Sequence, residues 1–184
     1  NNQELEQLLN TKYSSQPPYR MAQVDIDAIY DESSKENTED NINDLINRLK
    51  ASGVNTVALQ TFVDTSGSGN IEQVYFHSGN APVRADIFSH IVIKLSHEGI
   101  QTYAWVTTLA NTWMSKDPDS YIQATSPDKL GWYRRLTPFS AANRRKITEM
   151  VAEIAIYAPI SGILFQDDMY MNDFEDFSPP AKEA

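Results

Sequence analysis

The stretch "NTEDNINDLINRLKASGVNTVALQTF" (37–62) sets the architecture of the chain, because it contains a complete helix followed by a complete strand. Thr38 is the expected N-cap of the helix, and Gly53 is the expected residue just beyond its C-terminus. The segment 54–62 is rich in β-branched residues and predicts a strand. The helix, 37–53, has the spacing of one apolar face at Ile42, Leu45, Ile46 and Leu49.

The same alternation continues along the rest of the chain. Further strands are predicted at 22–30, 100–106 and 160–166, and further helices at 84–99 and 140–158. The apolar faces of these two helices are Phe88, Ile91, Val92 and Leu95 in the first, and Ile147, Met150, Val151 and Ile154 in the second, which has Ser140 as its expected cap. Alternating strands and helices predict a parallel sheet with right-handed crossovers.

The fold class expected is α/β, and the choice lies between a doubly wound sheet and a (β/α)8 barrel. A doubly wound sheet usually carries a glycine-rich loop after its first strand, whereas "YDESSKEN" (30–37) has no glycine. A TIM-barrel-like fold therefore fits better, with about the first four βα units present. Residues 1–10 are expected to form a short amphipathic helix, 1–20 as a whole to be an N-terminal linker, and 21–184 to be the N-terminal part of a barrel domain.

Composition narrows the classes of partner. The 184 residues are 41% hydrophobic, which suits one compact domain, and the formal net charge is −10. This acidity argues against nucleic acid and against an anionic membrane surface as partners, but it is compatible with a cationic ligand. The chain has no cysteine, so disulfides and thiolate metal sites are excluded. No apolar run approaches the ~18 residues of a membrane span, and the first residues resemble an internal boundary rather than a signal peptide.

Acidic and aromatic residues follow the predicted strands, at the end where barrel enzymes place their active sites. Asp25 and Asp27 alternate with Val24 and Ile26, so we expect them to share a strand face that points into the barrel. Trp105 is expected in the core, and Trp113, in a polar loop, is the better candidate for stacking on a sugar. The residues delivered to this rim are Asp25, Asp27, Tyr30, Asp31, Gln60, Phe62, Asp64, Trp105, Trp113, Gln166, Asp167, Asp168, Asp173 and Glu175.

The stretch "GILFQDDMYMNDFED" (162–176) concentrates carboxylates directly after what is expected to be a buried strand. Two carboxyl groups can cleave a glycosidic bond, one as the acid and the other as nucleophile or base, and further carboxylates can bind ammonium groups. A solvated loop is the simpler explanation for the cluster as a whole. For Asp167 and Asp168 a functional role is favoured, because one of two adjacent residues at a strand end is expected to point inward. Calcium binding is disfavoured, because the stretch lacks the glycine and the alternating ligands of an EF-hand loop. His77, His90 and His97 show no metal spacing, so no metal or other cofactor is expected.

Several segments together resemble a known family. They are "QVDIDAIYD", "GVNTVALQTFVDTSGSG", "VYFHSGNAPVRADIF", "YAWV", "RRLTPFS" and "GILFQDDMYMNDFED", in this order. They resemble the C-terminal glycoside-hydrolase domain of PgaB/HmsF-type poly-β-1,6-N-acetyl-D-glucosamine N-deacetylases. The resemblance implies a (β/α)-barrel domain that binds partly deacetylated polymer of biofilms and, in some members, cleaves it. It also implies a periplasmic parent protein associated with the outer membrane, with a lipid anchor and a metal-dependent deacetylase domain outside this chain.

The resemblance assigns roles to individual residues. Asp167, Asp168 and Asp173 match the acidic motif and are the expected catalytic or amino-sugar-binding residues, while Gln166 stands where the family commonly has His. Tyr133, with Trp132 beside it, falls where an aromatic sugar contact is expected. The expected substrate-binding set is Asp25, Asp27, Tyr30, Gln60, Asp64, Arg84, Trp105, Trp113, Tyr133 and Glu175.

Three functions remain open from the sequence. The first is a glycoside hydrolase domain, or its N-terminal half, acting on the β-1,6-linked glucosamine and N-acetylglucosamine polymer. If the second catalytic carboxylate lies on a later strand, such a half is not a complete hydrolase. The second is a non-catalytic module that guides the same polymer towards an export pore, and the third is a purely structural domain.

Overall fold

The computed structural model describes residues 18–131 and 133–184, together with positions 3 and 6. The helix predicted for 1–10 and the linker predicted for 1–20 lie almost entirely outside the described residues. Trp132 also lies outside them.

Four parallel strands form one sheet in the order β1-β2-β3-β4. The strands are β1 (Met21–Val24), β2 (Thr56–Gln60), β3 (Gln101–Val106) and β4 (Gly162–Phe165). The helices between them are α2 (Lys35–Ala51), α3 (Phe88–His97) and α4 (Ala141–Tyr157). The predicted βα alternation and the parallel sheet are therefore confirmed.

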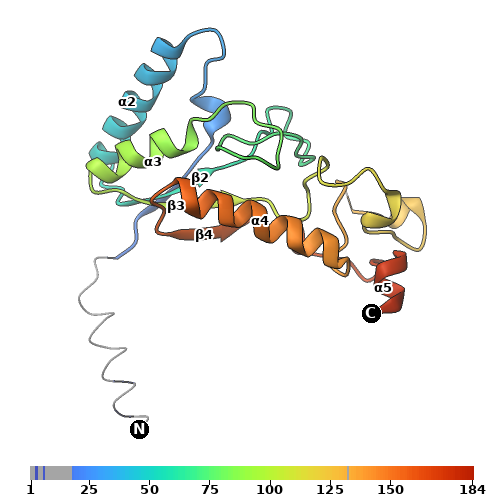
Figure 1. Cartoon of the computed structure of the whole chain (residues 1–184). Coiled ribbons are helices and arrows are strands. Elements are labelled where there is room, and N and C mark those ends of the chain that lie inside the picture. The colour runs from blue at the N-terminus through green and yellow to red at the C-terminus, as the bar shows by residue number, and fades with distance from the viewer. Residues whose placement is uncertain (1–2, 4–5, 7–17, 132) are drawn as a thin grey trace.

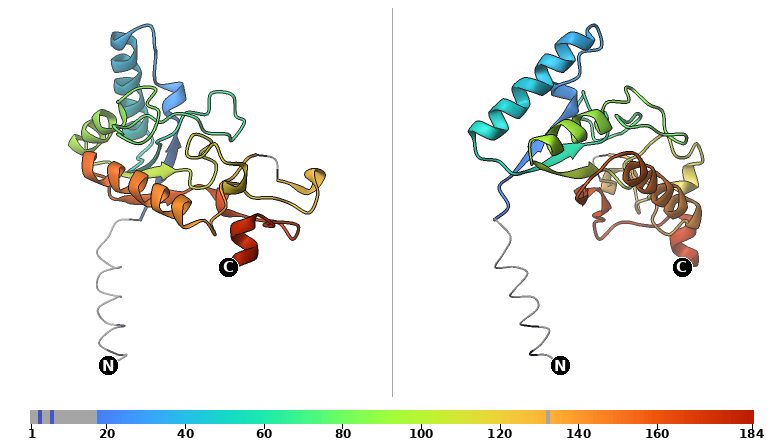
Figure 2. Two further views of the ribbon diagram at one scale, coloured as in Figure 1. Left: turned by 45° about the vertical axis from the view of Figure 1, so that its right-hand side comes forward. Right: turned by 60° about the vertical axis from the view of Figure 1, so that its left-hand side comes forward.

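All three connecting helices lie along the same side of the sheet (Figures 1 and 2). This follows from the strand order, because right-handed crossovers that always advance in one direction put every helix on one face. A doubly wound sheet instead reverses direction at a switch point and carries helices on both faces. The chain thus has the architecture predicted for it, four βα-type units of a TIM-barrel-like fold.

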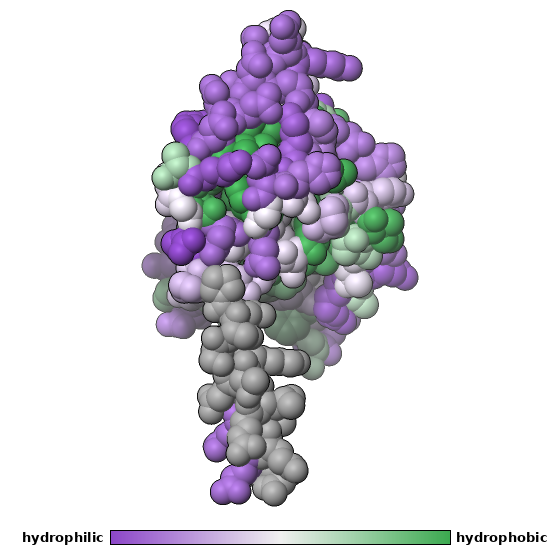
Figure 3. Space-filling view, turned by 90° about the vertical axis from the view of Figure 1, so that its left-hand side faces the viewer, coloured by the Kyte–Doolittle hydropathy of each residue, from purple (hydrophilic) through white to green (hydrophobic). Residues whose placement is uncertain are grey.

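The strands end on the right of Figure 1, where the long loops after β2, β3 and β4 gather. The short turns η1 (Ile26–Ala28), η2 (Pro118–Ser120), η3 (Pro127–Lys129) and η4 (Asp167–Met169) belong to this end, as does the final helix α5 (Pro179–Glu183). Figure 3 looks onto the opposite end, where the strands begin, and shows a mostly hydrophilic surface there. The loops that build a site are therefore on one end of the sheet.

The core lies between the sheet and the helices. The predicted apolar faces of α2 and α3 are buried throughout, while in α4 Met150 and Ile154 are buried and Ile147 and Val151 pack partly against the core. β3 shows the two faces of the sheet: Thr102, Ala104 and Val106 are buried, and Tyr103 and Trp105 between them are partly exposed. The second face is the one that a barrel turns inward.

Ser34, and not Thr38, is the N-cap of α2. The Ser34 hydroxyl accepts a hydrogen bond from the Asn37 N–H at 3.1 Å. Thr38 lies buried in the first turn, where its hydroxyl accepts from the Asp31 N–H at 3.0 Å. The helix ends as predicted before Gly53, whose φ of 69° is readily adopted by glycine.

The cap gives a prediction of stability. Ser34→Ala removes the acceptor for the Asn37 N–H, so we expect it to lower the free energy of unfolding by about 1 kcal/mol. Urea unfolding followed by circular dichroism measures this change. Ser96→Ala is the matched control, because Ser96 is exposed on α3 and is expected to shift the unfolding midpoint little. Equal effects of the two substitutions would contradict the capping role.

Other boundaries also differ from the sequence expectation. α3 begins at Phe88 rather than at residue 84, because Arg84 and Ile87 donate their N–H groups to Val74 and Tyr75 in the preceding loop. β1 ends at Val24 rather than at residue 30, so Asp25 and Asp27 do not share a strand face, and that expectation is wrong. Asp25 is exposed before η1, and Asp27 lies within η1.

β4 is not the buried strand that the sequence suggested. Leu164 is 41% exposed and Phe165 is 49% exposed. β4 is the last strand in the sheet order, so its outer edge has no strand beside it among the described residues. An apolar run after a long helix marks a strand, but it does not say how much of that strand is covered.

Candidate functional site

Three adjoining hollows lie at the ends of the strands. The central hollow, of about 160 Å³, is lined by Asp64, Gly69, Tyr133, Gln166, Asp167 and Asp168 among others. The polar hollow, of about 590 Å³, is lined by residues that include Asp64, Ser68, Asn70, Glu72, Arg84 and Arg134. The aromatic hollow, of about 320 Å³, is lined by residues that include Tyr133, Arg135, Asp167, Tyr170, Asn172 and Glu175.

Shared residues place the central hollow between the other two. Asp64 lines both the polar and the central hollow, and Tyr133 and Asp167 line both the central and the aromatic hollow. A row of adjoining hollows at the mouth of a barrel suits an extended ligand more than a compact one.

The two adjacent aspartates after β4 have opposite surroundings. Asp168 is fully buried, and its Oδ2 accepts the N–H groups of Thr108 and Leu109 at 2.7 Å and of Ala110 at 2.9 Å. Its Oδ1 accepts the Thr108 hydroxyl at 2.6 Å. These donors come from the loop after β3, so the Asp168 carboxylate holds that loop against β4.

Asp167 is exposed and lines two of the hollows. Its carboxylate makes no hydrogen bond or ion pair with the described part of the chain. The backbone oxygen of Asp167 accepts a hydrogen bond from the Tyr170 N–H. The turn η4 follows the strand at once and sends the two neighbouring side chains in different directions. Asp167 is therefore the member of the pair that a ligand can reach.

Tyr133 forms a wall between the central and aromatic hollows. Its side chain is buried, and a Cβ added at Gly69 would lie 3.1 Å from the Tyr133 ring, so the absence of a side chain at Gly69 leaves room for the ring. Burial raises the pKa of the Tyr133 phenol, and the negative charges of Asp167 and Asp168 raise it further. The phenol thus stays protonated at neutral pH beside the Asp167 carboxylate.

Asp27 belongs to a network that joins the loops after β1 and β2. Its carboxylate accepts from the Tyr75 hydroxyl at 2.6 Å, from Gln60 Nε2 at 2.9 Å and from the Asp64 N–H at 3.0 Å. Gln60 Oε1 accepts in turn from the Asp27 N–H at 3.1 Å. Burial, and then the hydrogen bond to Asp27, raise the pKa of the Tyr75 phenol. Asp27 and Gln60 therefore position Asp64 rather than face the hollows.

Asp64 closes its own loop. Its carboxylate accepts the N–H groups of Ser68, at 2.9 Å, and Gly69, at 3.1 Å to the nearer oxygen. These bonds fix the carboxylate at the boundary of the polar and central hollows. Asp64 and Asp167 are thus two carboxylates that line one small hollow from the segments that follow β2 and β4.

Glu175 forms a buried ion pair. Its Oε1 lies 2.7 Å from the Arg135 guanidinium and accepts the Gly131 N–H at 2.6 Å, and Oε2 accepts the Asn172 N–H at 3.2 Å. Side-chain exposure is 4% for Arg135 and 0% for Glu175. Arg135 also donates to the Tyr170 carbonyl. The pair thus fixes the floor of the aromatic hollow.

This pair gives a second prediction. Glu175→Gln leaves the Arg135 charge buried without its partner, so we expect the free energy of unfolding to fall by about 3 kcal/mol. Thermal unfolding followed by circular dichroism measures the loss. Asp173→Asn is the control, since Asp173 lies in the same loop but is exposed. A Glu175→Gln protein as stable as the control would mean that the ion pair contributes nothing.

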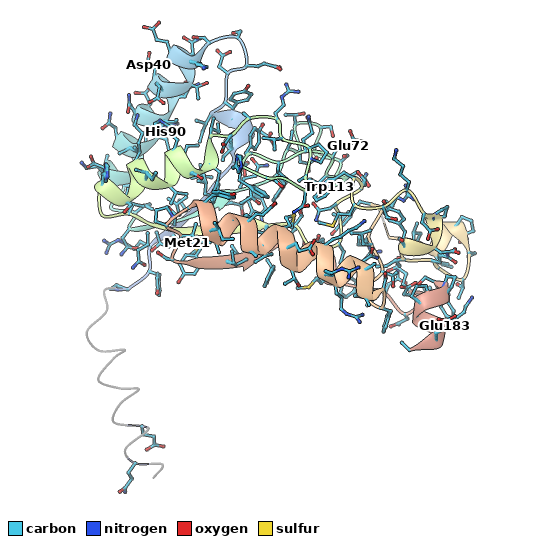
Figure 4. All side chains as sticks on the ribbon, viewed as in Figure 1. Met21, Asp40, Glu72, His90, Trp113 and Glu183 are labelled. Carbon is cyan, nitrogen blue, oxygen red and sulfur yellow. The ribbon has the colours of Figure 1, made fainter. Side chains whose placement is uncertain are left out.

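Trp113 and Trp105 have different surroundings. Trp113 packs partly buried against the main core, and its indole nitrogen is buried without a hydrogen-bond partner in the described structure. It lies in the loop after β3, beyond the strand ends in Figure 4, but it does not line any of the three hollows. Trp105 packs edge-to-face on Phe62 at 4.9 Å and donates from Nε1 to Gln166 Oε1 at 2.5 Å.

The remaining candidates lie around the rim. Asp25 and Asp173 are exposed and line none of the three hollows. Tyr30 packs edge-to-face on Tyr75, with the ring centroids 5.9 Å apart. Tyr30 lines a separate hollow beside α2. Arg84 lines the polar hollow and donates to Glu32 at 2.5 Å. The structure therefore brings Asp64, Tyr133, Asp167 and Asp168 together in one hollow. Arg84 shares the polar hollow with Asp64, whereas Asp25, Tyr30 and Asp173 lie apart.

Sequence reasoning missed Arg134 and Arg135 as residues of the hollows. Gln166, which the sequence placed on the rim directly before the aspartate pair, lines the central hollow. In the ranges 18–131 and 133–184, no group of three or more His, Asp or Glu side chains has an arrangement that could hold a metal ion. None of the helices described there is both long enough and apolar enough to span a membrane.

Comparison with known proteins identifies relatives. The family model described as "Hypothetical glycosyl hydrolase family 13" matches residues 23–184. The poly-beta-1,6-N-acetyl-D-glucosamine N-deacetylase of Escherichia coli K12 is 34% identical over 177 residues, which cover 91% of this chain and 25% of that protein. The chain thus spans about a quarter of the length of the curated relatives it matches.

Solved structures agree with this relationship. The PgaB (BpsB) glycoside hydrolase domain from Bordetella bronchiseptica is 36% identical, with a TM-score of 0.82, and the match covers 90% of this chain and 48% of that one. Alpha-L-fucosidase isoenzyme 2 from Paenibacillus thiaminolyticus has a TM-score of 0.63 at 14% identity, covering 91% of this chain and 26% of that one. At that identity the second match shows a shared fold alone.

Proposed function

Since the chain belongs to the hypothetical glycosyl hydrolase family 13, we propose that it binds and hydrolyses partly de-N-acetylated poly-β-1,6-N-acetyl-D-glucosamine. The observation that carries the proposal is Asp167, a carboxylate that lines two adjoining hollows and has no protein partner in the described structure. The substrate class is suggested by the curated relatives, whose names specify poly-beta-1,6-N-acetyl-D-glucosamine as the substrate of an N-deacetylase.

The chemistry requires two carboxyl groups. One donates a proton to the glycosidic oxygen as the C1–O bond breaks, and the other attacks C1 or removes a proton from the attacking water. Among the described residues, Asp167 and Asp64 line the same hollow, and we assign them as this pair. Asp64 is fixed by its loop and Asp167 is open, so we assign substrate contact first to Asp167.

Charge supports the choice of polymer. Removal of N-acetyl groups leaves amines that are protonated at neutral pH, and the chain carries a formal net charge of −10. An ammonium group close to the Asp167 carboxylate gains attraction that a neutral sugar does not. The protonated Tyr133 phenol supplies a neutral wall beside it. We further propose that the protein acts in the periplasm, with any lipid anchor outside these residues.

A non-catalytic binding module is the second candidate, and one observation favours it. Asp27, Asp64, Asp168 and Glu175 are all engaged by hydrogen bonds from the protein, which leaves Asp167 as the single open carboxylate lining the central hollow within the described residues. One open carboxylate is enough to bind an amino sugar, whereas hydrolysis needs a second group.

Digestion of the partly de-N-acetylated polymer separates these functions. The 184-residue chain is incubated with the polymer, and products are measured by mass spectrometry beside binding by calorimetry. We expect shorter oligosaccharides with the wild-type chain and none with Asp167→Asn. Binding without shorter products would support the binding module instead. Absence of both binding and cleavage would contradict both functions.

A further inference from the structure

We propose that Gln166 is a specificity-determining residue, whose side-chain amide group donates a hydrogen bond to an uncharged oxygen of the sugar in the central hollow. The inference rests on the proposed function, because it concerns the same hollow. It assigns a role to Gln166 and to its partner Trp105.

The direction of the Gln166 amide is fixed by chemistry. The Trp105 indole nitrogen carries a hydrogen and can only donate, so the atom that it meets at 2.5 Å must be the Gln166 oxygen. The amide NH₂ group of Gln166 is then left on the other side. It has no hydrogen-bond partner within the described residues, and it is not among their buried unsatisfied atoms. An oriented donor therefore remains available in a wall of the central hollow.

The supporting side chain is itself held in place. Trp105 on β3 lies opposite Leu164 on β4 in the sheet register. β4 leads directly into Gln166. The Trp105 ring packs edge-to-face on the Phe62 ring, with the ring centroids 4.9 Å apart. The Gln166 backbone is fixed as well, because its N–H donates to Val106 at 2.8 Å. Trp105 is therefore a positioning residue, which sets the direction of the amide without contacting the ligand.

An oriented NH₂ group discriminates between ligand groups. It donates to a hydroxyl oxygen or to the carbonyl oxygen of an acetamido group, but it repels an ammonium group, which is also a donor. Asp167, close by in the same hollow, has the opposite preference. The Gln166 amide is thus a donor beside the Asp167 acceptor in the central hollow. Gln166 adds recognition of a neutral oxygen to a site whose negative charge favours cations.

The test compares binding of short β-1,6-linked glucosamine oligosaccharides in two forms, fully N-acetylated and fully de-N-acetylated. Gln166→Leu removes the donor, and we expect it to weaken the affinity for the preferred form about tenfold. Gln166→Glu keeps the shape and the acceptor for Trp105 but adds a charge, so we expect weaker binding of the N-acetylated form and tighter binding of the de-N-acetylated form. If the donor meets an acetamido carbonyl, Gln166→Leu affects mainly the N-acetylated form; if it meets a hydroxyl, both forms weaken.

The role of Trp105 is tested by a double-mutant cycle. Trp105→Phe keeps an aromatic ring but removes the indole N–H, so the amide is free to turn, and we expect a loss of affinity of about threefold. In the Gln166→Leu background the same change is expected to add no further loss. Gln101→Leu, an exposed residue at the other end of β3, is the matched control with unchanged binding.

Two outcomes overturn the inference and are distinguishable. If the wild-type chain binds and Gln166→Leu binds equally well, the inference is wrong and the proposed function stands. If the wild-type chain binds neither form, the proposed function fails and the inference fails with it. Additive losses from Trp105→Phe and Gln166→Leu would remove Trp105 from the account.

Discussion

The Asp167→Asn variant is expected to lose at least about a hundredfold in the rate of polymer cleavage, the magnitude typical of removing a general acid or base. Asparagine keeps the shape of the side chain but can neither carry the negative charge nor give up a proton. Because Asp167 is exposed and its carboxylate has no partner in the described structure, we expect stability within about 0.5 kcal/mol of wild type. Cleavage is measured by release of reducing ends, and stability by thermal unfolding.

The control for this prediction is Asp173→Asn. Asp173 belongs to the same acidic motif and is exposed, but it lines none of the three hollows. We expect it to keep most of the activity. If Asp173→Asn is inactive and Asp167→Asn is fully active, the assignment made from the hollows is wrong and the motif acts through its later member.

The second large effect is expected at Asp168, and there it concerns stability. Asp168→Ala leaves three backbone N–H groups and one hydroxyl without their acceptor in a fully buried place. We expect the free energy of unfolding to fall by at least about 3 kcal/mol. For a domain of this size that corresponds to a fall in melting temperature of roughly 6–12 °C.

Asp168→Asn separates stability from chemistry. One amide oxygen can replace part of the acceptor, but the amide NH₂ group then faces donors, so we expect an intermediate loss of stability. Activity is measured per folded molecule, at a temperature where the variant is fully folded. A variant as stable as wild type but inactive would show that Asp168 acts in chemistry and that its hydrogen bonds are incidental.

The elements were predictable because each depends on residues close together in the chain. The apolar spacing of α2, with Ile42 and Leu49 on one face, is a local signal, and so is the glycine that ends the helix. The strand order needed one further rule, the right-handed crossover. The cap was misplaced because Thr38 and Ser34 are both good capping residues, and a contact of Thr38 with Asp31 decided between them.

The roles of individual acids were not predictable in this way. Asp167 and Asp168 are neighbours of the same type, and they differ only because the loop after β3 presents three N–H groups to Asp168. Glu175 looked like part of a solvated acidic rim, but a distant arginine, Arg135, buries it. Trp113 stands among polar residues in the sequence and nevertheless packs on the core. Each outcome depends on a segment far away in the chain.

Carboxylate footprinting tests the central claim most directly. A diazo reagent that esterifies carboxylates and leaves amines unmodified is applied to the chain with and without the partly de-N-acetylated polymer, and fragmentation mass spectrometry locates the ester. We expect Asp167 to be labelled in the free protein and protected by the polymer, and Asp168 to stay unlabelled in both. Asp40, on α2 and away from the loops in Figure 4, is the control whose labelling does not change. Labelling of Asp167 that the polymer leaves unchanged while it binds, or rapid labelling of Asp168 in the folded protein, would contradict the account.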